Sequence, residues 1–238
     1  MGRLPLLLSG FGMAAAWGLA SCAADGREGG RGDRERMVAT QIAARGVKDP
    51  CVLEAMRAVP RERFVPADQR PLAFADGPLA IGQGQTISQP YIVALMTELA
   101  RPSPSTRVLE VGTGSGYQAA VLAACAGEVY TIEILPELGR RAEGLLKELG
   151  VANVHVRIGD GYDGWPEAAP FDAIVVTAAP DSIPKPLLEQ LKVGGRLVIP
   201  VGTWNQDLVV VTRTADGYRR ESVIPVRFVP MTGKAEQD

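Results

Sequence analysis

The chain has 238 residues, a length that suits one domain with a short appendage. Apolar residues make up 46% and charged residues 22%, as in a globular protein with a sizeable core, and a net charge of -2 gives no basic surface for nucleic acid. The single histidine, His155, lies in a strand-like apolar run and is expected to be half-buried structure rather than a catalytic base. The three scattered cysteines lack the paired spacing of a zinc site and indicate no disulfide framework.

The first segment resembles an export signal. One early positive charge, Arg3, precedes an apolar stretch from residue 4 to residue 20, which is short for a membrane span and typical of a signal-peptide core. It ends in Leu-Ala-Ser-Cys, which resembles a bacterial lipobox in which Cys22 would be diacylated. Residues 23–33 are rich in glycine and predict a flexible tether. The alternative is that translation begins further on, for example at Met37.

The next part of the chain predicts helices. Residues 34–45 are amphipathic and Gly46 ends them. Asp49 and Pro50 are typical of an N-cap and a first helical turn, which opens a second helix through Arg57. Residues 60–84 are irregular and rich in proline, and a third helix is expected at 91–100. We expect residues 34–238 to form a single domain.

From residue 107 onward, apolar strands alternate with helices. The expected strands are 107–111, 128–134, 154–159, 171–177 and 196–201, and the expected helices are 117–126, 136–149 and 186–191. Continuous apolar strands indicate a parallel sheet that is covered on both faces. Two last strands, 208–212 and 221–224, are joined through Asp216 and Gly217, which is typical of a hairpin. These patterns predict an α/β fold, a Rossmann-like class I methyltransferase sheet with a C-terminal antiparallel hairpin and additional N-terminal helices.

A glycine-rich loop joins the first of these strands to its helix. Gly112, Gly114 and Gly116 allow close approach of a ligand to the backbone, and the helix start offers free N–H groups. The dinucleotide fingerprint would place its third glycine at position 117, which is Tyr117. Glu110, just before the loop, would repel a pyrophosphate but suits the amino group of S-adenosylmethionine (SAM). The loop therefore favours a SAM site.

Acidic residues end the following two strands. A carboxylate at Glu133 can accept hydrogen bonds from both ribose hydroxyls, and one at Asp160, beside Gly161, can accept from the adenine amino group. Each residue alone could be a solvated strand end or a turn former. Together with the loop, they indicate a cofactor site at the edge where open α/β sheets bind ligands.

A further element, Thr86-Ile87-Ser88-Gln89-Pro90, precedes the helix expected at 91–100. Together with segments 36–46, 59–65, 81–91, 110–117, 159–161, 170–179, 194–202 and 226–230, it resembles the protein-L-isoaspartate O-methyltransferase family, from about Arg34 to the C-terminus. The element at 86–90 is more specific to that family than the SAM loop, which many methyltransferases share.

The resemblance implies repair of damaged proteins. The family esterifies the free carboxylate of isoaspartyl residues with the methyl group of SAM, without a metal, and the ester then closes to a succinimide that reopens partly to aspartate. Ser88 matches the active-site serine, whose hydroxyl would donate a hydrogen bond to the substrate carboxylate. Thr86, Ile87 and Gln89 resemble loop positions that enclose cofactor and substrate. Residues 226–230 resemble a substrate-contacting segment, or else they form only the last strand.

Two other functions stay open at this point. The chain could methylate a small molecule or RNA, or it could bind SAM without turnover at the envelope. We expect isoaspartyl proteins and peptides as partners, no nucleic acid, and a monomer. Because SAM is made inside the cell, the cytoplasm is favoured as the location, and the alternative is an exported lipoprotein held at the membrane through Cys22.

Overall fold

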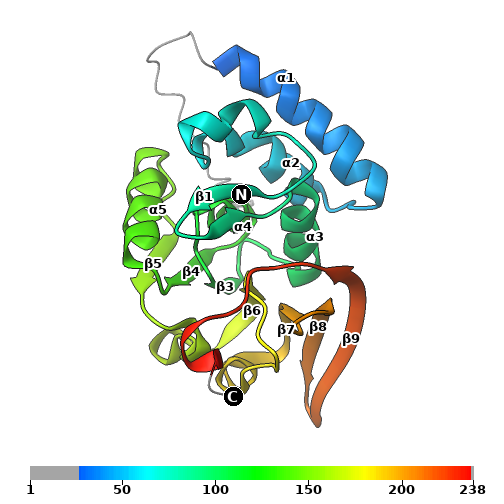
Figure 1. The fold of residues 1–238 in the computed structure, drawn as a ribbon. Helices are drawn as coiled ribbons and strands as arrows, with labels where there is room; N and C mark the ends of the chain where they lie inside the picture. Colours follow the sequence, from blue (N-terminus) through cyan, green and yellow to red (C-terminus); the bar gives the residue numbers. More distant parts are fainter. Residues whose placement is uncertain (1–26, 237–238) are drawn as a thin grey trace, which may run out of the picture.

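The computed structural model describes residues 27–236, and the signal-like segment with Cys22 lies outside this range. A seven-stranded sheet in the order β5-β4-β3-β6-β7-β8-β9 forms the centre, parallel from β5 to β7 and antiparallel at β8 and β9 (Figure 1). Its strands are β3 (Arg107–Val111), β4 (Glu128–Glu133), β5 (Val154–Ile158), β6 (Phe171–Val176), β7 (Leu191–Val201), β8 (Gln206–Thr214) and β9 (Gly217–Val226). The predicted mostly parallel sheet with a terminal hairpin is confirmed.

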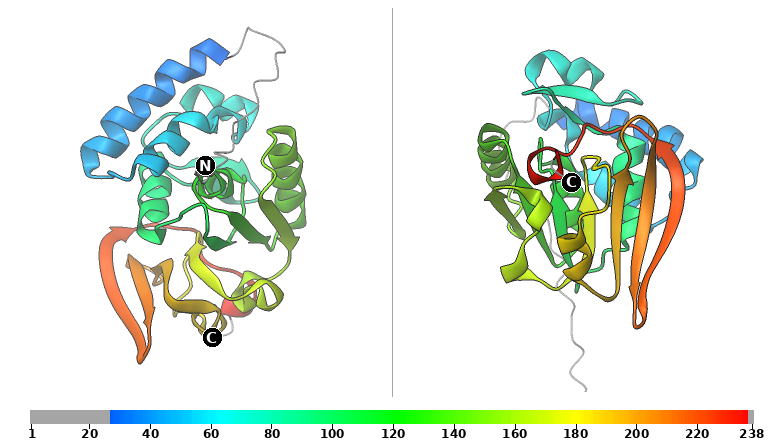
Figure 2. Two further views of the ribbon diagram at one scale, coloured as in Figure 1. Left: turned by 180° about the vertical axis from the view of Figure 1, so that it is seen from behind. Right: turned by 60° about the horizontal axis from the view of Figure 1, so that its bottom comes forward.

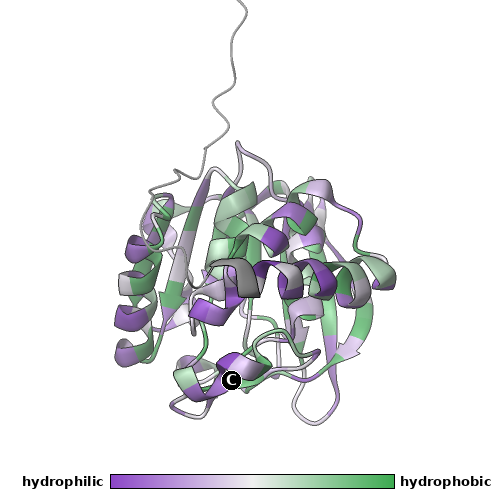
Figure 3. Ribbon diagram, turned by 90° about the horizontal axis from the view of Figure 1, so that it is seen from above, coloured by the Kyte–Doolittle hydropathy of each residue, from purple (hydrophilic) through white to green (hydrophobic). Residues whose placement is uncertain are grey.

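Helices cover both faces of this sheet. The helices are α1 (Arg27–Met37), α2 (Pro50–Ala58), α3 (Pro90–Ala100), α4 (Tyr117–Cys125), α5 (Pro136–Glu148) and α6 (Lys185–Glu189). Side chains of α2, α3, α4 and α5 share one core cluster with Val108 and Val175, and α6 contributes Leu187 to a second cluster with Leu109 and Ile174. Because neighbouring residues of a strand face opposite sides, each central strand is buried on both faces. The two layers lie on either side of the sheet in Figure 2. Hydrophobic residues are concentrated on the strands, and hydrophilic residues on the outer sides of the helices (Figure 3).

The N-terminal part differs from the prediction at its start. Helix α1 begins at Arg27, so the expected tether is helical from that residue onward. The helix then widens in a π-helical turn (Val38–Ile42) and narrows in a 3-10 turn (Ala43–Arg45), and Gly46 ends it with a φ of 97°. Arg34 fixes α1 against α2 by donating to the backbone oxygen of Arg57, and it also pairs with Glu62. These tertiary contacts favour helix where the glycine content predicted a flexible chain.

The cysteine prediction was wrong. Cys51 in α2 and Cys125 in α4 are joined by a disulfide, with 5.9 Å between their Cα atoms. The two helices pack against each other, and this packing brings together residues that are 74 positions apart in the sequence. Spacing alone does not show such a long-range contact.

His155 lies on β5, at the edge of the sheet. Its ring stacks on Tyr130 with 4.7 Å between the ring centroids, and its side chain is 46% exposed, so about half of it is covered. It lines neither of the two cavities described below. No helix within residues 27–236 is long and apolar enough to cross a membrane.

Candidate active site

The order of the strands places a crevice at the carboxyl ends of β3 and β6. The chain runs outward from β3 to β4 and β5, and then returns to place β6 on the other side of β3. At such a switch point the loops after neighbouring strands diverge and leave room for a ligand. The glycine-rich loop follows β3, and Thr177 follows β6.

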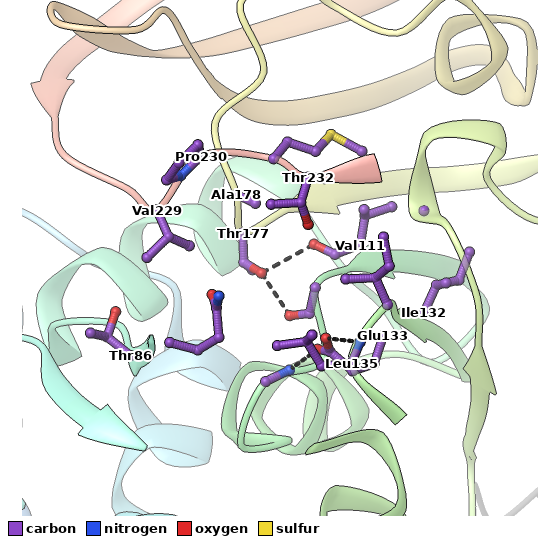
Figure 4. A pocket seen from close by; sticks show the side chains of 16 residues that line it. Thr86, Val111, Ile132, Glu133, Leu135, Thr177, Ala178, Val229, Pro230 and Thr232 are labelled. Carbon is purple, nitrogen blue, oxygen red and sulfur yellow. Dashed lines mark hydrogen bonds between the residues drawn. The ribbon is translucent and has the colours of Figure 1, made fainter. Parts of the chain in front are cut away.

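A cavity occupies this crevice (Figure 4). Five of the predicted site residues line it: Thr86, Gly112, Gly114, Glu133 and Gly161. Apolar side chains after β4 form one wall, and a segment that follows β9 closes the opposite side. The further lining residues are Gln85, Val111, Ile132, Ile134, Leu135, Thr177, Ala178, Val229, Pro230, Met231 and Thr232.

Gly112 allows the loop to approach Thr177 closely. Its φ is 96°, and a Cβ atom built on it would lie 2.4 Å from the Thr177 hydroxyl oxygen. That hydroxyl instead donates to the backbone oxygen of Gly112, at 2.6 Å, and lies 3.1 Å from that of Val111. Any side chain at Gly112 would therefore displace the loop as well as strain the backbone.

Glu133 holds its carboxylate at the floor of the cavity. One oxygen accepts from the Gly114 N–H at 2.7 Å and the other accepts from the Leu135 N–H at 2.9 Å (Figure 4). The side chain is 5% exposed, so these bonds form away from water and are strong. A carboxylate with two further lone pairs in this place can also accept from the hydroxyls of a ligand.

Glu110 lies below the loop and does not line the cavity. It is fully buried, and Thr131 donates a hydrogen bond of 2.5 Å to it, while the Thr113 and Thr131 hydroxyl oxygens lie 2.6 Å apart. Burial raises the pKa of Glu110 to about 8, against the effect of the Thr131 bond and with a smaller contribution from Glu133. Glu110 therefore supports the loop from beneath as a protonated carboxyl at neutral pH.

Four more predicted cofactor residues do not line this cavity: Gly116, Asp160, Ile87 and Gln89. Gly116 is the N-cap of α4 and faces Ala142 and Leu146. Asp160 is engaged by the backbone, because it accepts from the N–H groups of Tyr162 and Lys234.

Ile87 is buried in the core and lines a small adjoining recess with Ser88 and Gly114. Gln89 also lies outside the first cavity, and it donates a bond of 2.6 Å to the side chain of Asp76.

A second cavity of about 430 Å³ adjoins the first. Ser88, Gln89 and the segment from Pro225 to Val229 line it, and Arg227 is the one charged side chain among its lining residues. The two cavities share Thr86, Thr177 and Val229. A ligand in the first cavity and a ligand in the second would therefore meet at these three residues.

Sequence reasoning missed Thr177, Ala178, Met231 and Thr232. Thr177 is the last residue of the predicted strand 171–177, and a search of all strand ends for polar residues would have found it. The sequence around Met231 and Thr232 contains no pattern that indicates a site, because a contact with a distant segment brings them to the cavity. The backbone N–H of Ala179 donates to the Val229 oxygen, and the Ala179 oxygen accepts from the Met231 N–H. Over residues 27–236, no group of three or more histidines, cysteines or carboxylates could hold a metal ion.

Comparison with known proteins gives a consistent result. Residues 32–236 match the family protein-L-isoaspartate(D-aspartate) O-methyltransferase. A protein-L-isoaspartate O-methyltransferase of Picosynechococcus is 61% identical over 200 residues, which cover 84% of this chain and 90% of that protein. One of Gloeobacter violaceus is 58% identical over 204 residues, 85% of this chain and all of that protein.

Solved structures agree. One named protein-L-isoaspartate O-methyltransferase has a TM-score of 0.79 at 30% identity and covers 85% of this chain and 67% of its own. A structure from Plasmodium falciparum, titled a putative enzyme of the same name in complex with S-adenosyl-L-homocysteine, has a TM-score of 0.73 at 24% identity and covers 84% of this chain and 98% of its own. At 24% identity, the similarity to this second structure shows a shared fold and nothing more.

Proposed function

The chain belongs to the protein-L-isoaspartate(D-aspartate) O-methyltransferase family, and we propose that it methylates isoaspartyl residues of damaged proteins where the two cavities meet. The observation that carries the proposal is the sharing of Thr86, Thr177 and Val229 by both cavities. A methyl donor in one and a carboxylate in the other would be in contact there.

The first cavity fits SAM. Gly112 and Gly114 line it without side chains, so a ligand can approach the backbone of the loop, and the Glu133 carboxylate can accept from the ribose hydroxyls. Ile132, Ile134 and Leu135 offer apolar surface for an adenine ring. When bound, SAM supplies a methyl group that its sulfonium already activates. No metal is part of the proposal.

The second cavity fits a carboxylate. Arg227 gives it a positive charge, and Ser88 offers a hydroxyl donor within it. A substrate carboxylate has a pKa near 4 and is ionised at neutral pH, so it attacks without a general base. The protein therefore needs to hold the carboxylate in line and to exclude water, and positioning of this kind can supply about 7–11 kcal/mol of the barrier.

Ser88 is proposed to hold one carboxylate oxygen by a charge-assisted hydrogen bond, which contributes about 1.5–3 kcal/mol. A nucleophilic role is excluded by the lack of a base, since His155 lines neither cavity. The transfer leaves S-adenosylhomocysteine, and the methyl ester then closes to a succinimide by attack of a backbone amide nitrogen with loss of methanol, without further help from the protein, as the family's reaction implies.

The decisive experiment uses two synthetic peptides that differ only in one isoaspartyl or aspartyl linkage, with SAM labelled on its methyl group. We expect base-labile label in the isoaspartyl peptide and none in its partner. Label in neither peptide, with SAM still bound, would support a non-catalytic SAM-binding protein. Label in RNA or in a small molecule of a cell extract, and in neither peptide, would support the other alternative. We expect a monomer on size exclusion, without nucleic acid.

Two locations are proposed, and they differ in their consequences for the cysteines. The supply of SAM favours the cytoplasm. The Cys51–Cys125 disulfide favours export through the lipobox-like segment, because disulfides persist in oxidising compartments. Labelling with palmitate in wild type but not in Cys22→Ala would establish the lipoprotein. No labelling, together with free Cys51 and Cys125 thiols after rapid alkylation, would establish the cytoplasm.

A further inference from the structure

Arg61 is a charged side chain in the core of the molecule. It is the first residue of the 3-10 turn Arg61–Arg63, directly after Pro60, and is 0% exposed. It forms no salt bridge with any carboxylate in the part of the chain that the structure describes, and burial lowers its pKa. Burying an arginine without a carboxylate partner costs free energy. The contacts that Arg61 makes instead therefore indicate what the residue does.

The guanidinium connects three segments that are distant in sequence. Its Nε donates to the Ala73 backbone oxygen at 2.8 Å, and its Nη2 donates to the Ser88 backbone oxygen at 2.7 Å. Its Cζ lies 4.8 Å from the centroid of the Tyr117 ring, a cation–π contact. Tyr117 is the first residue of α4 and directly follows the glycine-rich loop.

The bond to Ser88 restrains the peptide group between Ser88 and Gln89. Gln89 is followed by Pro90, the first residue of α3. The proline ring fixes the φ angle of Pro90 and so restricts the backbone further. With the carbonyl held on one side and α3 beginning on the other, the direction of the Ser88 side chain is restricted. The ring of Tyr117 gives the guanidinium its position relative to the cofactor loop, and Ser88 and Tyr117 line the same small recess.

We propose that Arg61 is a positioning residue for the methyl transfer, which acts by holding Ser88 at a fixed place relative to the cofactor loop. This inference rests on the proposed role of Ser88. Arg61 itself lines neither cavity and touches neither ligand. Lysine in its place carries its donors on a single nitrogen and does not reproduce the separate positions of Nε and Nη2 beside the two carbonyl oxygens.

The test is a double-mutant cycle of Arg61→Lys and Ser88→Ala, measured as kcat on the isoaspartyl peptide at saturating SAM. Arg61→Lys alone is expected to lower kcat about tenfold. In the Ser88→Ala background, the same change is expected to lower kcat less than twofold, because the hydroxyl that Arg61 positions is gone. The affinity for S-adenosylhomocysteine is expected to change less than twofold in every variant.

Arg63→Lys is the matched control. Arg63 lies in the same 3-10 turn, but its side chain is 42% exposed and pairs with Glu148. We expect wild-type kcat from it. Arg61→Gln, which keeps a donor without the charge, repeats the cycle if Arg61→Lys does not fold.

Three results would overturn the inference: an equal fall in kcat with and without the Ser88 hydroxyl, an unchanged kcat in Arg61→Lys, or failure of both Arg61 variants to fold, which would assign the residue to the fold alone. A wild-type enzyme that does not methylate the isoaspartyl peptide would instead contradict the proposed function.

Discussion

Cys51 in the first turn of α2 and Cys125 at the end of α4 form a disulfide that ties the N-terminal helices to the helix after the cofactor loop. The bond closes a long stretch of chain that includes β1 (Leu79–Gly82), β2 (Gln85–Ile87) and α3. Ser88 lies within that stretch. The disulfide thus closes the stretch of chain that contributes Thr86, Ser88 and Gly112 to the walls of the cavities.

Loss of this disulfide is expected to destabilise the protein. A cross-link that closes a long loop stabilises by about 2–4 kcal/mol, chiefly through the unfolded chain, which corresponds to a fall in Tm of about 5–15 °C. Cys51→Ser is the suitable change, because Cys51 is exposed and Cys125 is buried. Thermal unfolding of wild type with and without dithiothreitol supplies the control. Equal Tm values for oxidised wild type, reduced wild type and the variant would contradict the expectation.

Ser88→Ala is expected to reduce turnover and to spare the cofactor. Loss of one charge-assisted bond of about 1.5–3 kcal/mol corresponds to a fall in kcat of about 10- to 100-fold. Ser88 lines the second cavity and not the first, so the affinity for S-adenosylhomocysteine should change less than twofold by calorimetry. Ser105→Ala, an exposed serine in a loop, is the control. Unchanged turnover would remove Ser88 from the mechanism.

Glu133→Gln is expected to have the opposite pattern. An amide presents one acceptor instead of two, so it loses the bond to the N–H of Gly114 or to that of Leu135, and it weakens any bond to ribose. We expect the Kd for SAM to rise about 10- to 100-fold, with a smaller change in kcat at saturating SAM. Glu137→Gln, an exposed carboxylate at the start of α5, should bind SAM as wild type does. A normal Kd in Glu133→Gln would show that Glu133 only shapes the loop.

Local signals in the sequence were sufficient for most elements. Asp49 caps α2 with a bond from the Val52 N–H, as its position before Pro50 predicts, and the strand β3 has the expected ends. What local signals could not show depends on contacts between distant segments. The return of the chain after β9 places Thr232 beside the cofactor loop, and the packing of α2 on α4 pairs the cysteines.

The direction of a side chain was the other missing information. The position of Glu110 just before the loop suggested a contact with the ligand. Residues of a strand alternate between faces, however, and the loop turns away immediately after β3. Glu110 therefore points into the protein toward Thr131, whereas Glu133 reaches the cavity. The sequence does not distinguish these two acids, because both lie within the last two residues of an apolar strand.

The burial of Glu110 has a consequence for stability as pH changes. Its pKa is about 8 in the folded protein, against an ordinary value of 4.5. Between these values the folded protein holds a proton that the unfolded chain has released. The free energy of unfolding therefore falls as pH rises from about 4.5 to about 8, by at most about 1.4 kcal/mol per pH unit from this group.

Glu110→Gln should remove this part of the pH dependence. Glutamine is neutral at every pH, has nearly the same shape and still accepts a hydrogen bond from Thr131. We expect it to match wild type in urea unfolding near pH 5 and to exceed wild type in stability near pH 8.5. Glu148→Gln, a carboxylate that is 64% exposed on α5, should follow the wild-type pH curve. Parallel curves for Glu110→Gln and wild type from pH 5 to pH 8.5 would show that Glu110 is ionised in the core.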